Sequence, residues 1–515
     1  MEEVISRTRW MRRRHIEVHI SSDGIAVLRR NLFPGFGQQT ELVRWQEVAG
    51  ASAEAVRRGG HLHIARRDGA PDLVVKELIA EQAAWAASLI TDELQYRARR
   101  ADPVMSNPVP VGEIPEVAKR LVAAGDGAIP AVVDFLLVQG VFHGASDVHL
   151  EPSYRALRIR YRIDGMLDDI VTLETEVTDR VLARLKLLAN LAVFRKDVPQ
   201  EGRVVIDVQS RSVDLRVSVL PTLHGEKAVV RIFDSAKALF PLDHLGMSPE
   251  VESQFISLLA RPQGAILLTG PANSGKTTTL YAAIDHIHER RRGLASIVTV
   301  EDPVEYDLGL VSQTQVNPAV GLTFASGLRT VLRQDPEVIM LGEIRDAETA
   351  EIAIRAGLTG HLILSTAHAR SAAGVFARLI DIGMEPFLVA SAVTAVVAQR
   401  LVRTLCPDCS HPERPSPDLL AQVGLREPPA GARFRVGKGC QACRGTGYRG
   451  RTGVFHLLPM SSPLRDLVMG RLSAQDLERR AAQVAPGSLL QAGIEKAAQG
   501  VTSLEEISRV IGPED

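Results

Sequence analysis

Apolar and polar residues alternate along much of the first hundred residues of the chain. Segments 15–20 and 61–65 show this alternation most clearly, and it is typical of strands that bury one face. Apolar positions at helical spacing then run from about residue 74 to residue 96. We therefore predict a small β-rich module over residues 1–100 that closes with an amphipathic helix, followed by a proline-containing linker over residues 101–114.

The pattern changes between residues 115 and 240, where helical and strand patterns are mixed. Residues 130–142 and 177–191 carry helical patterns. Alternating strands are predicted at 157–163, 203–208, 213–220 and 227–233. Such a mixture predicts an α+β domain.

From residue 241 to residue 400, short continuous apolar runs alternate with helical patterns. The runs occupy residues 265–269, 297–300, 338–341 and 361–365. Strands without polar alternation are buried on both faces, as in a parallel sheet covered by helices. We predict an α/β domain here. Residues 401–515 are predicted to be helical, apart from a Pro- and Gly-rich insert at about 404–450.

Composition and charge exclude several classes of protein. The chain has 515 residues, of which 45% are apolar and 23% charged, so it is long enough for several globular domains. Its formal charge of −1 gives no electrostatic reason to expect nucleic acid as the main partner. No run of about 18 uncharged apolar residues occurs, which argues against a membrane-spanning helix. Arg12, Arg13 and Arg14 interrupt the first twenty residues, which argues against a secretory signal.

A glycine-rich loop lies between a predicted buried strand and a predicted helix. Gly270, Gly275, Lys276 and Thr277 satisfy the pattern Gly-x4-Gly-Lys-Ser/Thr, and the flanking elements disfavour a simple glycine turn. In such a loop the backbone N–H groups surround phosphate, the lysine neutralises β/γ charge and the threonine binds Mg²⁺. The predicted nucleotide-binding residues are Gly270, Pro271, Ala272, Asn273, Ser274, Gly275, Lys276, Thr277 and Thr278.

Two acidic segments follow predicted strands downstream of this loop. Glu301 follows the apolar run 297–300, and Glu343 follows the run 338–341. Carboxylates at the carboxyl ends of parallel strands face the crevice in which open α/β sheets bind ligands. We predict that Glu343 holds Mg²⁺ through water and that Glu301 orients or deprotonates the attacking water. Alone, each would be interpreted as a solvated loop residue; the phosphate loop favours the catalytic interpretation.

All four cysteines fall into two Cys-x-x-Cys pairs, Cys406 with Cys409 and Cys440 with Cys443. Four thiolates suit a closed, tetrahedral and therefore structural zinc site. The long spacer between the pairs is tolerable because loop-closure entropy grows slowly with length. A redox pair in either half and free buried thiols are the alternatives. So few cysteines favour the reducing cytoplasm over a disulfide-held secreted protein.

Residues 115–515 resemble the secretion-ATPase family of type II secretion and type IV pilus assembly, within the RecA-like P-loop ATPases. The match is carried by the phosphate loop and, in this order, by the boxes 301–305, 328–336, 342–346, 360–368 and 399–401. Residues 1–110 do not resemble the family's usual N-terminal module. The resemblance implies a RecA-like ATPase domain at 241–400, an α+β second N-domain at 115–240 and a helical, zinc-bearing C-terminal region.

The resemblance also implies cofactors, partners and a location. It implies ATP, Mg²⁺ and a zinc ion, and a homo-hexamer that works with an inner-membrane platform protein and a cytoplasmic adaptor. Such a chain would lie in the cytoplasm, peripheral at the inner face of the cytoplasmic membrane. The implied function is a mechanochemical ATPase that powers assembly of a pseudopilus or pilus. A RecA-like DNA translocase and a catalytically weak regulatory subunit of the same machine are the alternatives.

Four further side chains gain roles through the resemblance. In the family, the second N-domain closes over the nucleotide and presents arginines that match Arg216 and Arg231, in the manner of arginine fingers. By spacing alone these would be solvated strand residues. His361 and His368 would sense the state of the nucleotide.

The chain departs from the family's usual residues near the phosphates. Ala272 and Asn273 stand where threonine and glycine are usual, and Arg370 stands where asparagine is usual. Asparagine tolerates positive φ better than other non-glycine residues, so we expect the loop to form. Because Lys276 and Glu343 are intact, we favour an active enzyme.

Overall fold

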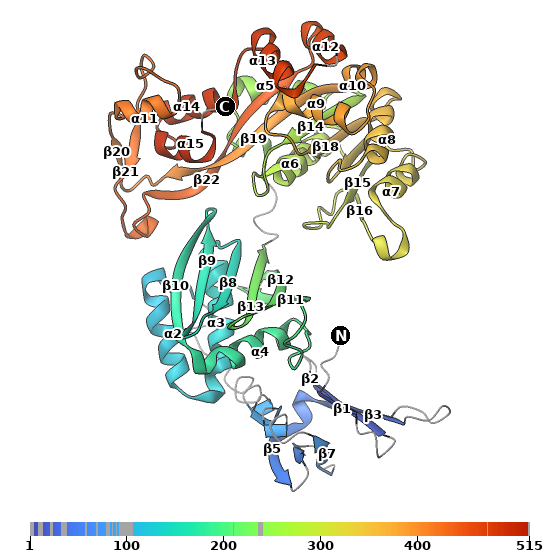
Figure 1. The fold of residues 1–515 in the computed structure, drawn as a ribbon, viewed down its shortest axis with the longest axis vertical. Coiled ribbons are helices and arrows are strands. Elements are labelled where there is room, and N and C mark those ends of the chain that lie inside the picture. The colour runs from blue at the N-terminus through green and yellow to red at the C-terminus, as the bar shows by residue number, and fades with distance from the viewer. Residues whose placement is uncertain are drawn as a thin grey trace. The chain divides into compact units, whose positions relative to one another are not determined.

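The computed structural model describes residues 107–512 except 210, 235–239 and 471. Before residue 107 it describes 5–8, 14–20, 24–31, 39–56, 59–67, 71–78 and, within 83–91, all but 85 and 89. The chain divides into two compact units, residues 1–234 and residues 235–515 (Figure 1). Among the described residues, no helix is both long and apolar enough to cross a membrane.

The described part of the N-terminal region is β-rich, with two small antiparallel sheets. The first has the order β1(Ile5–Thr8), β2(Arg14–Ile20), β3(Gly24–Asn31), β4(Gln39–Arg44), and the second has the order β5(Val48–Val56), β6(Gly59–Arg66), β7(Leu73–Leu78). The predicted helix is wrong at its start, because Leu73–Leu78 is a strand whose Leu73 and Val75 are buried. Described residues within 83–91 are helical. Residues 79–82 and 92–106, which include residues 101–106 of the predicted linker, lie outside the described residues.

A six-stranded antiparallel sheet with helices on one face forms the rest of the first unit. Its order is β10(Met166–Glu174), β9(Ala156–Ile163), β8(Asp147–Pro152), β13(Gly225–Phe233), β12(Arg211–Thr222), β11(Gln200–Val208). The helices are α2(Ile114–Ala123), α3(Ile129–Phe142) and α4(Thr178–Leu188), and they lie against this sheet (Figure 1).

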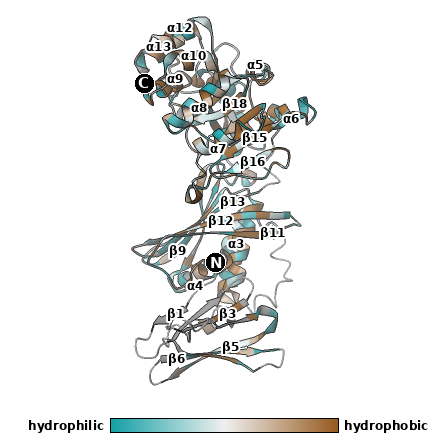
Figure 2. Cartoon of the chain, turned by 90° about the vertical axis from the view of Figure 1, so that its right-hand side faces the viewer, coloured by the Kyte–Doolittle hydropathy of each residue, from teal (hydrophilic) through white to brown (hydrophobic). Residues whose placement is uncertain are grey.

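Alternation along β12 shows why this sheet has one buried face. Val213, Leu215, Val217 and Val219 are buried in the apolar core shared with the helices. Arg216 lies between two of them and therefore points to the opposite, polar face. The same alternation appears as brown and teal bands along the strands in Figure 2.

A seven-stranded, mainly parallel sheet organises the second unit, as predicted. Its order is β16(Ser312–Gln315), β15(Ile297–Glu301), β17(Val338–Leu341), β18(Leu362–Ala367), β14(Gly264–Thr269), β19(Val393–Leu405), β22(Tyr448–Pro459). All neighbouring pairs are parallel except β19 with β22. The helices around it are α5(Pro249–Leu259), α6(Lys276–Arg290), α7(Phe324–Val331), α8(Ala347–Leu358), α9(Ala372–Asp381) and α10(Pro386–Ala392).

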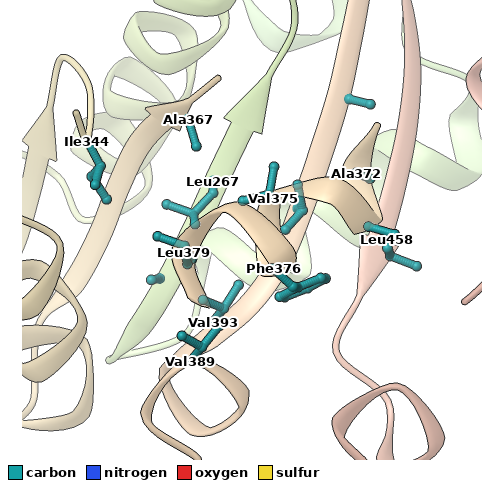
Figure 3. Close-up of a cluster of buried hydrophobic side chains, with 14 of the residues drawn as sticks. Leu267, Ile344, Ala367, Ala372, Val375, Phe376, Leu379, Val389, Val393 and Leu458 are labelled. Atoms are coloured by element: carbon teal, nitrogen blue, oxygen red, sulfur yellow. The ribbon is translucent and has the colours of Figure 1, made fainter. Parts of the chain in front are cut away.

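Both faces of this sheet are covered by apolar clusters. Along β14, Leu267 contributes to one cluster, whereas Ile266 and Leu268 contribute to the other. Figure 3 shows part of the first cluster, to which Phe376 of α9 and Val393 of β19 both contribute. Because both faces are buried, apolar and polar residues do not alternate along the strand.

The C-terminal region adds one long strand that the sequence analysis did not predict. Its helices are α11(Pro417–Gln422), α12(Ser462–Met469), α13(Ala474–Val484), α14(Leu489–Ala498) and α15(Leu504–Val510). β22, with 12 residues, pairs with the 13-residue β19 and closes that edge of the sheet. The sheet therefore extends past residue 400, where we placed a domain boundary.

Candidate nucleotide site and metal centre

The predicted phosphate loop joins β14 to α6, with Lys276 as the first helical residue. Asn273 has φ 62° and Gly275 has φ 85°, a left-handed conformation that asparagine and glycine accept most readily. The departure from the family's usual glycine at position 273 is therefore compatible with the turn, as we expected.

Strand β19 lies directly beneath this loop. A Cβ atom on Gly270 would come within 2.4 Å of the Gln399 carbonyl oxygen, and one on Gly275 within 2.9 Å of Gln399 Nε2. Thr279 Oγ1 donates a hydrogen bond of 2.9 Å to Gln399 Oε1. Gln399 thus packs against the phosphate loop and forms a hydrogen bond with the first turn of α6. The sequence analysis noted residues 399–401 only as a family string and missed this role.

The loop and helix start offer hydrogen-bond donors that suit phosphate. No side chain caps the N-terminus of α6, whereas Ser248, Asp346 and Ser371 cap α5, α8 and α9. In addition, the buried Ser274 Oγ has no hydrogen-bond partner among the described residues. Unsatisfied donors at a helix N-terminus, together with its partial positive charge, favour an anion.

Lys276 occupies the position expected for the phosphate-binding lysine. Its Nζ donates to the carbonyl oxygens of Gly270 at 2.8 Å and Pro271 at 2.9 Å. Burial lowers the pKa of Lys276, and the nearby Arg400 guanidinium acts in the same direction, while the Glu343 carboxylate opposes both. Lys276 therefore interacts electrostatically with Glu343 at the carboxyl ends of the parallel strands.

Glu343 follows β17 at the same edge and is held by two basic side chains. His368 Nε2 lies 3.1 Å from Glu343 Oε2, and Arg345 donates to Glu343 Oε1. Arg345 also lies 3.5 Å from Asp302 Oδ2 in the acidic box. Burial alone would raise the pKa of Glu343, but the hydrogen bonds and charges of Arg345 and His368 lower it. The carboxylate therefore remains ionised, as a magnesium-binding role requires.

His361 does not lie at this edge. It precedes β18, and its carbonyl oxygen accepts from the Gly264 N–H at the start of β14. Its Nδ1 lies 3.2 Å from the Ala356 carbonyl oxygen. Because β14 and β18 are parallel, His361 is at the end of the sheet opposite the phosphate loop. The prediction that His361 senses nucleotide is wrong for this reason, whereas His368 remains a candidate.

Glu301 is buried beneath the site, with only 2% of its surface exposed. Its Oε1 accepts from Thr299 Oγ1 at 2.6 Å and from Gln313 Nε2 at 3.0 Å, and its Oε2 accepts from the Tyr281 hydroxyl. Both oxygens are thus engaged by internal donors. Because the carboxylate is almost fully buried, a role in handling water requires that the side chains around it move.

The two predicted arginines belong to a row of three on the polar face of the first unit's sheet. In the strand register, Arg216 lies directly opposite both Arg203 and Arg231. The Arg216 guanidinium also stacks 4.2 Å above the Phe233 ring, while Arg231 Nε donates to Asp147 Oδ1 at 3.1 Å. Arg203 Nε donates to Asp214 Oδ1 at 2.6 Å. Carboxylates of the same sheet therefore partner two of the three arginines, which offsets the repulsion expected between like charges in direct cross-strand positions. The sequence analysis did not predict Arg203 as a site residue.

The four cysteines converge on one point in the C-terminal region. The Sγ atoms of Cys406 and Cys440 are 3.8 Å apart, and those of Cys409 and Cys443 are 3.7 Å apart. Zinc–sulfur bonds of about 2.3 Å in a tetrahedron place sulfur atoms about 3.8 Å apart. Burial acts to raise the pKa of the Cys443 thiol, but the N–H groups of Cys440 and Gly447 outweigh it and lower the pKa. The donor set and spacing therefore fit a structural zinc ion.

Comparison with known proteins agrees with this geometry. A family profile described as "Type II/IV secretion system protein" matches residues 122–509. The chain belongs to this family.

Relatives of this secretion-family chain include secretion and pilus ATPases. Type II secretion system ATPase E of Vibrio cholerae serotype O1 is 42% identical over 398 residues, which cover 77% of this chain and 78% of that protein. Type IV pilus assembly ATPase PilB of Acinetobacter baylyi is 42% identical over 389 residues, which cover 75% of this chain and 66% of PilB. The resemblance read from the sequence motifs is thus confirmed.

The fold class is confirmed as well. The solved structure of the Legionella pneumophila ATPase DotB aligns with a TM-score of 0.54 at 19% identity, covering 74% of this chain and 95% of DotB. At that identity the likeness concerns the fold.

The hydrogen bond between Tyr281 and Glu301 in this secretion-family chain can be tested directly. We expect Tyr281→Phe to lower the free energy of unfolding by about 1–3 kcal/mol, because a buried carboxylate loses one donor. Chemical denaturation of the purified chain measures this. Tyr154→Phe, at an exposed tyrosine, serves as the control and should change nothing. Equal stability of both variants would contradict the importance of this contact.

The cysteine cluster makes a separate prediction. We expect it to hold about one zinc ion per chain, and Cys406→Ser to release that ion and lower thermal stability without changing nucleotide affinity. Zinc released during titration of the thiols, together with a melting curve, measures both effects. Gln441→Ala, at an exposed residue between two of the cysteines, is the control. A folded chain with four freely reactive thiols and no released zinc would contradict the assignment.

Proposed function

We propose that this chain is a mechanochemical ATPase that hydrolyses ATP to power assembly of a type II secretion pseudopilus or a type IV pilus. The observation that carries the proposal is the uncapped start of α6 behind a complete phosphate loop, with Glu343 and His368 at the same sheet edge. The named ATPase relatives support it.

Binding of ATP begins at the loop. Lys276 Nζ exchanges its two carbonyl partners within the loop for oxygens of the β and γ phosphates, and the first N–H groups of α6 donate to phosphate. Ser274 Oγ gains the partner that it lacks within the chain. Thr277 and Glu343 would hold Mg²⁺, which supplies charge neutralisation on the phosphates when it is bound.

Hydrolysis then depends on carboxylates and on cations from the first unit. Glu301 orients or deprotonates the attacking water once the Tyr281 hydroxyl leaves it, and His368 reports the state of the γ-phosphate to Glu343 through their contact. Arg216 and Arg231 meet the phosphates when the domain that carries them closes. A planar cation supplied only on closure couples hydrolysis to domain movement.

The proposed setting is that of a secretion machine. We propose that the chain forms a homo-hexamer, that the cysteine cluster binds zinc, and that the hexamer acts at the inner face of the cytoplasmic membrane. Its partners would be a platform protein in that membrane and a cytoplasmic adaptor. No observation favours a catalytically weak subunit, since Asn273 fits the left-handed turn of the loop. Nor does any favour a DNA translocase.

Replacement of the chromosomal gene tests the proposed function in the cell. We expect Glu343→Gln to stop protein secretion or surface-filament assembly, because the variant binds ATP without turning it over. Glu337→Gln is the control, since Glu337 is exposed and lies just before the start of the same strand. Normal secretion and normal filaments with Glu343→Gln would contradict the proposal.

A further inference from the structure

Two histidines and a glutamate converge on the β5–β6 hairpin of the N-terminal region, outside the residues that match the family profile. His61 and His63 are two residues apart on β6 and therefore share one face of the sheet. Glu54 on β5 lies directly opposite His61 in the strand register. The sequence analysis noted His61 and His63 only as part of an alternating strand.

The three side chains place their donor atoms at metal-ligand spacing. Glu54 Oε2 lies 3.5 Å from His63 Nε2 and 3.9 Å from His61 Nδ1, and one donor atom from each residue lies within 4.8 Å of the others. Bonds of about 2.0–2.1 Å in a tetrahedral site place ligand atoms roughly 3.4 Å apart. Only a small movement of these side chains is therefore needed to enclose an ion.

The strand that carries the two histidines is anchored in an apolar core. Leu62 and Ile64 alternate with the two histidines and are fully buried in an apolar core on the other face. The side chains of His61 and His63 are 23% and 36% exposed, so part of each ring faces solvent. His63 Nε2 is buried and has no hydrogen-bond partner among the described residues. A buried imidazole nitrogen without a partner is open to a metal ion.

We propose that Glu54, His61 and His63 bind one divalent transition-metal ion of the zinc class. Imidazole nitrogen suits Zn²⁺, Cu²⁺ and Ni²⁺, whereas Mg²⁺ and Ca²⁺ prefer oxygen ligands alone. Three protein ligands leave a fourth position for water or for a side chain of a partner. The site is chemically distinct from the four-thiolate cluster, so the chain holds two ions of different coordination.

Metal counting on the full-length chain tests this inference. After removal of metal with a chelator, titration with Zn²⁺ and desalting should leave two ions per wild-type chain and one per chain of the double variant His61→Asn with His63→Asn. His244→Asn, which removes an exposed histidine from the second unit, should leave two. Equal ion counts in the wild type and the double variant would overturn the proposal.

Cobalt substitution distinguishes the two sites without relying on the count. Co²⁺ bound to four thiolates absorbs strongly in the near ultraviolet through sulfur-to-metal charge transfer, whereas Co²⁺ bound to nitrogen and oxygen does not. The double variant should keep the charge-transfer band and lose the second binding step. Glu54→Gln should weaken only that second step, by at least about 10-fold. A second step unchanged in both variants would exclude these residues as ligands.

Discussion

Lys276→Ala abolishes both tight nucleotide binding and ATP hydrolysis by the purified chain. The expected effect is this large because Lys276 lies half-buried at the first position of α6, within the phosphate loop. Burial of a cation is costly unless an anion compensates it, and in the proposed mechanism the β and γ phosphates are that anion. Without the lysine, one of the cations near the ionised Glu343 is lost.

The measurement is nucleotide affinity together with the rate of ATP hydrolysis. Arg290→Ala is a matched control, because Arg290 is an exposed cation in the last turn of the same helix. It should leave both quantities near those of the wild type. Near-wild-type affinity or turnover in Lys276→Ala would remove the phosphate loop from the proposed mechanism.

Arg216→Ala and Arg231→Ala each reduce turnover by about 10³-fold, the loss expected for a missing arginine finger. Affinity for ATP falls much less, because cations that arrive on closure stabilise the charge of the transition state more than that of bound ATP. A loss in turnover that greatly exceeds the loss in affinity marks an interaction made mainly in the transition state. Single-turnover hydrolysis and equilibrium nucleotide binding measure the two quantities.

Arg158→Ala is the matched control for this pair. Arg158 is exposed on β9, and it alternates with the buried Leu157 and Ile159, so it points to the same polar face as the arginine row. It should affect neither quantity. Unaltered hydrolysis in both Arg216→Ala and Arg231→Ala would make them ordinary surface arginines.

The sequence predicted the central sheet well because its strands are continuous apolar runs between helices. The run 338–341 coincides with β17, and the run 265–269 is one residue shorter than β14. Burial on both faces makes such a strand mostly apolar, with few polar residues such as Thr299 and Ser365 inside it, so its position is visible in the sequence. The phosphate loop between β14 and α6 was also predictable from local sequence. Its turn includes the left-handed backbone conformation of Gly275, which glycine adopts most readily.

Features that depend on distant contacts were not predictable. β22 begins in a glycine-rich segment and becomes a strand because β19 offers it an edge to pair with. Similarly, β7 is a strand because it pairs with β6, although its residues also suit a helix. Such tertiary pairing overrides local propensity.

The roles of single side chains were the least predictable part of the site. The sequence gives no sign that Glu301 accepts from Tyr281 and Gln313, because those residues are far apart along the chain. His361 and His368 bracket one strand, and the predicted parallel sheet already favoured His368, just past the end of the strand, as the one beside the loop; the parallel pairing of β18 with β14 agrees. Arg203 joins Arg216 only through strand register.

The most direct test of the central claim is the steady-state rate of ATP hydrolysis by the purified chain, measured with and without double-stranded DNA. The Glu343→Gln variant is measured in the same way. The proposal predicts hydrolysis by the wild type that DNA does not stimulate, and ATP binding without hydrolysis by Glu343→Gln. Hydrolysis that persists in Glu343→Gln, or that the wild type shows only when DNA is present, would contradict the proposed secretion motor.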